Sequence, residues 1–316
     1  MSNPLVSVVI PLYNKEQWIV QTLLSVYSQS YRNWECYIID DGSTDRSLEL
    51  VQEFTASHPG NWKVVSQINS GQISARNLGI ELSSGNFVAF LDADDLWLPR
   101  KIEVQVAAHL ADPLIALSLT PYIIFKERQR RFFRVVSCSN SKRLIDDWLS
   151  MAGFGGLIES TGFMRRDALD ALGRYSATYS MTSGLDLSLK AAASFKVVVL
   201  KNPLVLYRLS LGQFHKQEDV LIRDLEIMTI KYSSSPEMLA HLRKLHSSYL
   251  YWSKCRSQGA RYFAVAAAKA ILLLRFRELP MLYFLLSRNL LATFRGFTKQ
   301  KMIRQSLDGY FESQSS

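Results

Sequence analysis

The first hundred residues alternate short apolar, β-branched runs with longer segments in which apolar residues recur every three or four positions. This alternation is typical of βαβ units and predicts a parallel sheet with helices packed against it. It predicts strands at 6–10, 35–39, 63–66 and 87–91, and helices at 16–29, 44–56 and 74–82. Ligands of such sheets bind at the carboxyl ends of the strands, so the residues directly after each strand are the candidates for function.

Later segments carry weaker patterns. They predict strands at 114–125, 131–136 and 158–164, a glycine-rich turn at 153–156, a helix that follows Pro99 and another at 186–193. From about residue 221 the pattern is helical, with helices expected at 223–232, 238–252 and 261–277. We therefore expect an α/β domain over residues 1–220, with a mixed but mostly parallel sheet, and a helical region over 221–316.

Composition narrows the class of protein. Of the 316 residues 48% are hydrophobic and 21% are charged, which fits a globular chain and excludes a disordered or collagen-like one. The three cysteines are far apart and form no CxxC pair, which argues against a disulfide framework or a structural zinc site. No signal peptide and no apolar stretch of the ~18–20 residues that a spanning helix needs are recognised, so we expect a cytoplasmic protein.

Positive charge is concentrated near the end of the chain. The net charge is +9, yet residues 241–304 hold 13 basic side chains against a single acid, Glu278, interleaved with apolar and aromatic runs. Three explanations stay open: docking on an anionic membrane surface, a helical lid or dimer surface with a solvated basic face, and nucleic-acid binding. We expect no nucleic acid as partner, because no recognised nucleic-acid-binding motif accompanies the charge. The oligomeric state stays open.

The segment Asp92-Ala93-Asp94-Asp95 is the most informative single feature. Side chains two positions apart on an extended segment point the same way, so Asp92 and Asp94 can face one point. Crowded carboxylates repel one another unless a cation lies between them, and oxygen ligands favour Mg²⁺ or Mn²⁺. The alternative is that Asp94 and Asp95 are ordinary turn residues before a helix.

Three other strand ends carry candidate binding groups. Asp40 and Asp41 can accept hydrogen bonds from a ribose or a base, and Tyr13 can stack on a base, although each also suits a turn or a rim position. Arg76 lies near a helix start, where arginine suits a phosphate or a carboxylate, although a solvated helix face is the more common reason for such an arginine when the segment is considered alone. No GxGxxG follows the first strand and no GxxxxGK[ST] occurs, which excludes dinucleotide-dehydrogenase and P-loop classes.

Four segments together, IPLYN, IDDGSTD, NSGQISARNLGI and FLDADDLWLP, resemble the family 2 glycosyltransferases in their order and spacing. The resemblance is specific over about residues 5–110 and looser to about 210. It implies the GT-A fold, a Rossmann-like mixed sheet flanked by helices, here with a helical C-terminal extension. It also implies an inverting enzyme of bacterial surface-polysaccharide synthesis.

The resemblance assigns roles to individual residues. Pro11, Tyr13 and Asp41, with Asp40 beside them, match the positions that hold the nucleoside base, and Arg76 matches an arginine near the nucleotide pocket. Asp92 matches the first aspartate of the DxD motif, near ribose and metal, and Asp94 matches the second, which binds the divalent cation, Mg²⁺ or Mn²⁺.

The catalytic base of the family is the aspartate of a GED-like segment before a helix. Ser183-Gly184-Leu185-Asp186 resembles that segment and nominates Asp186, although Leu185 stands where the family has glutamate. The family often has a histidine in a mobile loop two residues after a Tyr-Arg pair, and here that position is Ser210, with His215 the nearest histidine.

The resemblance implies transfer of a sugar from a nucleoside-diphosphate sugar to a hydroxyl of a glycan or a lipid-linked acceptor. It places the protein in the cytoplasm, with docking on the inner face of the cell membrane as the open alternative for residues 241–304. A catalytically inactive protein that binds sugar nucleotides or membrane surfaces is the competing interpretation, favoured by the missing glutamate. A nucleotidyltransferase would need a glycine-rich phosphate loop after the first strand, and Pro11-Leu12-Tyr13-Asn14 does not supply one.

Overall fold

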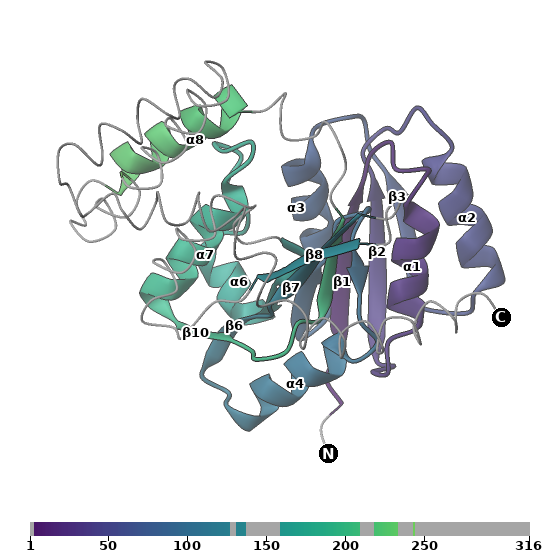
Figure 1. The fold of residues 1–316 in the computed structure, drawn as a ribbon, viewed down its shortest axis with the longest axis horizontal. Coiled ribbons are helices and arrows are strands. Elements are labelled where there is room, and N and C mark those ends of the chain that lie inside the picture. The colour runs from purple at the N-terminus through teal and green to yellow at the C-terminus, as the bar shows by residue number, and fades with distance from the viewer. Residues whose placement is uncertain (1–2, 127–130, 137–158, 209–217, 233–242, 244–316) are drawn as a thin grey trace. The chain divides into compact units, whose positions relative to one another are not determined.

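The computed structural model describes residues 3–126, 131–136, 159–208, 218–232 and 243, all of which lie in one compact unit, Met1–Leu250. Two sheets form in this part of the chain, one of seven strands and one of four. Helices cover both faces of the larger sheet (Figure 1).

The first half of the larger sheet is parallel. It consists of β1 (Val6–Leu12), β2 (Trp34–Asp40), β3 (Trp62–Ser66) and β4 (Phe87–Phe90). The order is β4-β1-β2-β3, and all three pairings are parallel. Every residue of β1 and β4 is buried, as expected of strands with helices on both faces. The four strands predicted from the alternation are thereby confirmed.

The second half of the sheet is mixed. β9 (Phe163–Arg165) runs antiparallel between β4 and β6 (Ile115–Leu119), and β10 (Lys196–Val199) pairs parallel with β6. The single strand expected over 114–125 is wrong, because Thr120 and Pro121 interrupt it and its two halves, β6 and β7 (Tyr122–Lys126), join different sheets. The prediction of a mixed, mostly parallel α/β sheet is confirmed.

Two layers of helices bury the two faces of this sheet. On one face, α1 (Ile19–Tyr27), α2 (Ser47–Ser57) and α4 (Lys101–Ala111) contribute Leu23, Val51 and Ile102 to a core built on the even-numbered residues of β1. On the other face, α3 (Gln72–Leu82), α6 (Arg166–Leu172) and α7 (Ser183–Ser194) form a second core around Val9. Figure 1 shows α1 and α2 on one side of the strands and α3, α6 and α7 on the other.

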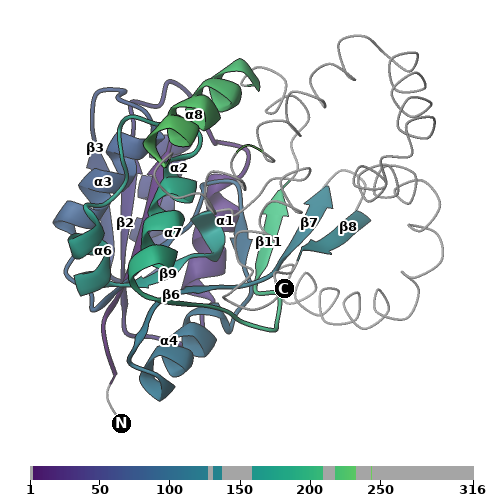
Figure 2. The ribbon, with the colours of Figure 1, turned by 90° about the vertical axis from the view of Figure 1, so that its left-hand side faces the viewer.

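The smaller sheet has the order β5-β11-β7-β8, with β5 (Leu96–Trp97), β11 (Val205–Arg208) and β8 (Arg131–Val136). β11 lies parallel to β7 and antiparallel to β5, and Figure 2 shows β11, β7 and β8 side by side. Because β5 follows β4 by six residues, this sheet adjoins the aspartate segment Asp92–Asp95. The alternation did not predict β5 or β11, which are too short to show a period.

Helix α8 (Glu218–Lys231) crosses residue 221, where the helical region was expected to begin. Its Asp224 carboxylate accepts hydrogen bonds from the backbone N–H groups of Met181 and Thr182, at 2.7 and 3.1 Å, and so ties α8 to the segment directly before α7. The helices expected at 238–252 and 261–277, the turn at 153–156 and two of the three cysteines lie outside the described residues. Within the described part, no helix is both long and apolar enough to cross a membrane.

Candidate active site

The ends of the parallel strands surround one cleft of about 470 Å³. Five of the residues predicted from sequence line it together: Pro11, Tyr13, Asp41, Asp92 and Asp94. The other lining residues are Leu12, Lys15, Asn69, Gly71, Gln72, Ala93, Met181, Tyr207 and Arg208. The topology therefore brings three separate sequence segments to one place, as expected for a sheet whose parallel strands end at the same edge.

Asn14 fixes the loop after β1. It adopts the left-handed conformation, with φ of 50°, which asparagine tolerates better than most residues. Its side-chain Oδ1 accepts a hydrogen bond from the backbone N–H of Thr44 at 2.8 Å, and its own N–H donates to Ser43 Oγ at 3.2 Å. The loops after β1 and β2 are therefore tied together, which holds Tyr13, 46% exposed, at the rim of the cleft.

Asp41 anchors the loop after β3. Its Oδ1 accepts hydrogen bonds from Gln67 Nε2 and the Ser70 N–H, both at 2.7 Å, and its Oδ2 accepts one from the Gly71 N–H at 2.8 Å. A carboxylate offers about four acceptor positions, so this loop leaves one of them for another donor. Asp40 is buried beside it and accepts a hydrogen bond from the Ser43 N–H at 3.2 Å.

Arg76 lies behind Asp92 in a buried charge cluster. Its Nη2 is 2.6 Å from Asp92 Oδ1 and its Nη1 is 3.8 Å from Glu159 Oε1, and only 3% of its side chain is exposed. Burial lowers the pKa of Arg76, but Asp92 and Glu159 outweigh it and raise the pKa above its ordinary value, so the guanidinium stays charged. The solvated helix face considered for Arg76 is therefore wrong.

Glu159 was not recognised from the sequence. It begins the short 3₁₀ helix η4 (Glu159–Thr161), and a Cβ on Gly184 at the start of α7 would collide with its Oε1. Burial raises the pKa of Glu159 and Asp92 adds to that effect, although Arg76 opposes it. Two carboxylates thus share one guanidinium beside the cleft.

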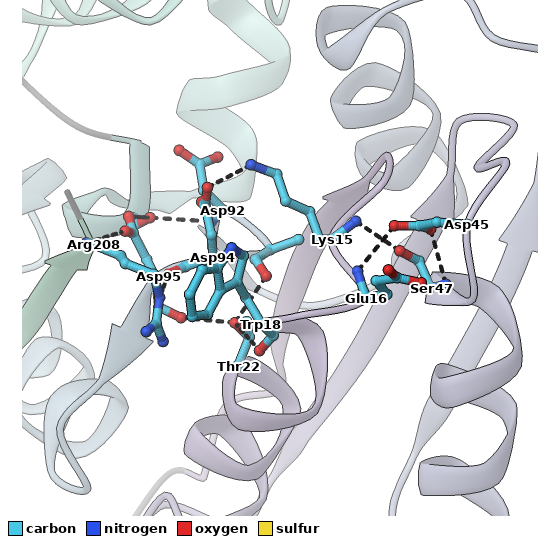
Figure 3. Close-up of polar contacts among 12 residues, drawn as sticks. Lys15, Glu16, Trp18, Thr22, Asp45, Ser47, Asp92, Asp94, Asp95 and Arg208 are labelled. Atoms are coloured by element: carbon cyan, nitrogen blue, oxygen red, sulfur yellow. Dashed lines mark hydrogen bonds and ion pairs between the residues drawn. The ribbon is translucent and has the colours of Figure 1, made fainter. Parts of the chain in front are cut away.

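Asp94 faces a different cation. The Lys15 Nζ lies 2.5 Å from Asp94 Oδ2, and 22% and 14% of the two side chains are exposed. Figure 3 shows Lys15 reaching from the loop after β1 toward the aspartate segment. Each of the two predicted metal ligands therefore has a basic partner.

Asp95 turns away from the cleft. Its Oδ2 accepts a hydrogen bond from Ser160 Oγ at 2.6 Å and its Oδ1 accepts one from the Arg208 N–H at 3.0 Å. Burial raises the pKa of Asp95, and the charges of Asp94 and Asp92 raise it further. Asp95 is therefore a structural residue of the turn, as the alternative interpretation of the sequence held for it.

Arg208 is the second group that the sequence did not reveal as part of the site. Its Nε donates to the Asp94 carbonyl oxygen at 2.7 Å, and its guanidinium lies over the rings of Trp18 and Phe125. The Tyr-Arg pair was noticed only as a landmark before a histidine. Its contact with Asp94 spans 114 residues, so no local pattern could reveal it.

Asp186 lies at the start of α7 and is fully buried. Its Oδ1 accepts hydrogen bonds from Lys231 Nζ at 2.5 Å and from Tyr232 Oη at 2.7 Å, and its Oδ2 lies 2.8 Å from Lys190 Nζ. Burial raises the pKa of Asp186, but these three donors outweigh it and hold the pKa below its ordinary value. Met181, from the segment before α7, lines the cleft, and Asp186 does not.

The donor set near the cleft suits a hard divalent cation. No group of three or more His, Cys, Asp or Glu side chains converges as a metal site among the described residues. Two carboxylates, Asp92 and Asp94, line the cleft from one turn. Mg²⁺ needs only one or two protein carboxylates when a substrate phosphate completes its coordination, so these residues fit such an ion. In this structure the Lys15 ammonium is a cation that contacts Asp94 Oδ2.

A family model described as glycosyl transferase family 2 matches residues 7–173, more than half of the chain. The match covers the strand ends that form the cleft. The chain belongs to glycosyltransferase family 2. The seven-stranded mixed sheet with helices on both faces is the GT-A fold, as the resemblance implied.

Curated relatives align with somewhat more than a third of this glycosyltransferase family 2 chain. A putative teichuronic acid biosynthesis glycosyltransferase, TuaG of Bacillus subtilis, is 38% identical over 39% of this chain and 49% of its own length. The Escherichia coli UDP-Glc:alpha-D-GlcNAc-diphosphoundecaprenol beta-1,3-glucosyltransferase WfgD is 38% identical over 35% of this chain and 43% of its own. These alignments span less than half of each relative.

Solved structures share the fold over more of the chain. S. aureus TarS 1–349 in complex with UDP superposes with a TM-score of 0.57 at 19% identity, covering 92% of this chain and 81% of that one. The mannosyltransferase PcManGT from Pyrobaculum calidifontis, in complex with GDP-Man and Mn²⁺, gives 0.61 at 16% identity, covering 95% and 88%. At such identities the similarity shows the fold alone.

Proposed function

We propose that this protein transfers a sugar from a nucleoside-diphosphate donor to a hydroxyl of a glycan or lipid-linked acceptor, with inversion at the anomeric carbon. The observation that carries the proposal is the convergence of Tyr13, Asp41, Asp92 and Asp94 from three strand ends on one cleft. A nucleoside-diphosphate sugar needs polar and aromatic groups around its base and ribose, and the cleft offers an aromatic ring and a carboxylate with one acceptor position left. Its diphosphate needs a cation, and the cleft offers a pair of carboxylates that suit a divalent ion.

The donor would lie with its base against Tyr13 and Asp41. The ring of Tyr13 offers a stacking face, and the remaining acceptor position of Asp41 can take an N–H of the base. Pro11 lines the same part of the cleft, and Asp40 supports the turn from behind. Arg76 acts in this proposal by fixing Asp92, because its Nη2 already donates to that carboxylate.

The diphosphate would lie against Asp92 and Asp94. Asp92 and Asp94 would hold a divalent ion, which when bound would neutralise the charge that develops on the leaving nucleoside diphosphate. Lys15 and Arg208 also line the cleft and add positive charge on the same side. The cleft can therefore balance the charge of the diphosphate in two ways, with a divalent ion bound by the carboxylates and with its own basic side chains.

Asp186 remains our proposed base. A carboxylate within hydrogen-bond reach of an acceptor hydroxyl can remove its proton as the new bond forms. Lys231 and Tyr232 occupy one oxygen of Asp186, so an acceptor hydroxyl would compete with them for this carboxylate. Glu159, which shares Arg76 with Asp92, is the other candidate, because a raised pKa makes a carboxylate a stronger proton acceptor.

The proposed acceptor and setting draw on the relatives' names, which mention a diphosphoundecaprenol acceptor and teichuronic acid biosynthesis. We likewise propose two domains, over residues 1–220 and 221–316. We also propose a cytoplasmic location, with membrane docking through residues 241–304. Except for Arg243, those basic residues lie outside the described part of the chain. Co-sedimentation with anionic vesicles but not with neutral ones would support docking.

A direct test incubates purified protein with UDP-, GDP- and dTDP-sugars and candidate acceptors, with Mn²⁺ or EDTA, and measures nucleoside diphosphate release. Metal-dependent release from one nucleotide class, lost in Asp92→Asn, supports the transferase. Nucleotide binding without release under any condition would instead support the competing interpretation of an inactive binding protein.

A further inference from the structure

Lys15 is a partly exposed cation at one of the predicted metal ligands. It pairs with Asp94 across two loops that are 79 residues apart in sequence, and its side chain is 22% exposed. Arg76, the cation at Asp92, is 3% exposed and also faces Glu159. Arg76 is thus enclosed with two carboxylates, whereas Lys15 is partly open to solvent where it meets Asp94.

Hydrogen bonds hold the backbone of Lys15 in place, and its side chain extends from there to Asp94. Its N–H donates to Ser47 Oγ at 2.7 Å, and the next N–H, of Glu16, donates to Asp45 Oδ2 at 3.2 Å. Figure 3 shows these anchors on one side of Lys15 and Asp94 on the other. The flexible four-carbon stem therefore starts from a fixed point and ends at Asp94.

We propose that Lys15 and a divalent cation compete for Asp94, so that Lys15 balances this carboxylate in metal-free protein and sets the metal affinity of the cleft. The proposal rests on the metal site of the proposed function. The Lys15 ammonium lies 2.5 Å from Asp94 Oδ2, so it repels a divalent ion bound at the same carboxylate, because both carry positive charge. Displaced from Asp94, Lys15 stays in the cleft as a cation for the donor diphosphate.

The test measures Mn²⁺ binding alone, by the loss of the free-ion electron paramagnetic resonance signal, for the full chain and for Lys15→Met. We expect Lys15→Met to bind Mn²⁺ about fivefold more tightly, the size expected for removing a partly exposed ion pair. Lys63→Met, the same change at an exposed lysine of β3, is the matched control and should leave the affinity unchanged.

Asp94→Asn completes the comparison. In that background Mn²⁺ binding should weaken, and adding Lys15→Met should no longer tighten it, because the shared carboxylate charge is gone. Equal or weaker Mn²⁺ binding by Lys15→Met overturns the competition, and so does a lack of binding by both the wild type and Lys15→Met at millimolar Mn²⁺. Because no nucleotide is present, a chain that failed to bind sugar nucleotides would still give a decisive result here.

Discussion

The contacts of Asp186 predict that replacing its charge costs stability as well as any role in proton transfer. Asp186→Asn keeps the shape of the side chain and an acceptor for Tyr232, but it leaves Lys190 and Lys231 without their carboxylate. Hydrogen bonds to charged groups contribute about 1.5–3 kcal/mol each, and breaking a buried ion pair costs about 3–5 kcal/mol.

The two lysine side chains are 27% and 39% exposed, which reduces these figures because water can solvate the ammonium groups that lose their partner. We therefore expect a loss of about 2 kcal/mol in the free energy of unfolding, or a fall of roughly 5 °C in melting temperature for a domain of this size. Urea denaturation monitored by circular dichroism measures the loss. Asp167→Asn, at a carboxylate 70% exposed on α6, is the matched control and should cost little.

Activity of the same variant separates the two roles. If Asp186 is the base, kcat falls about 10²–10⁴-fold while donor affinity is kept. If kcat is nearly kept in Asp186→Asn and lost in Glu159→Gln, the base is Glu159 and Asp186 only joins α7 to α8. An Asp186→Asn protein as stable as the wild type would refute the reasoning from these contacts.

Three further changes test other parts of the structure. Burial lowers the pKa of His109 to about 4, so the folded protein disfavours its protonation and the free energy of unfolding should fall by up to about 3 kcal/mol as pH drops from 6.5 to 4. Urea titrations at both pH values should show this loss, and an equal loss in His109→Gln would assign it to other groups. Arg76→Lys should cost about 2 kcal/mol and weaken donor binding, since one ammonium cannot pair with both Asp92 and Glu159; unchanged binding in calorimetry contradicts this. Gly42→Ala should cost about 1–2 kcal/mol, because Gly42 has φ of 70° and a Cβ there lies 3.1 Å from Asn69 N, and an unchanged urea midpoint would refute that strain.

The parallel half of the fold could be predicted because its signals are local. Strands β1 to β4 and the helices between them carry unbroken periodic patterns, and a parallel sheet gathers their ends at one edge. Tyr13, Asp41 and Asp94 were thus found from their position after a strand. The expected boundaries of α1 and α2 began three residues early, since the preceding polar residues form loops tied by Asn14.

The rest of the site depends on contacts between distant segments. Ser160 supports the aspartate segment from 65 residues away and Arg208 from 113, so neither leaves a local pattern. Two of the three partners of Asp186, Lys231 and Tyr232, likewise come from the end of α8 and the residue after it, 45 and 46 residues further on. A sequence pattern can locate a carboxylate at the start of a helix. Only the tertiary contacts reveal which side chains donate hydrogen bonds to that carboxylate.

Stabilisation by a sugar nucleotide is the most direct test of the proposed cleft. The measurement is the melting temperature of the full chain with UDP-, GDP- and dTDP-sugars in Mn²⁺ and in EDTA, beside Asp94→Asn and the Asp167→Asn control. A ligand at about 100 times its dissociation constant stabilises the folded state by about 2.7 kcal/mol. The account predicts a rise of several degrees with one nucleotide class in Mn²⁺, kept in Asp167→Asn and reduced in Asp94→Asn. No rise with any nucleotide under any metal condition would contradict it.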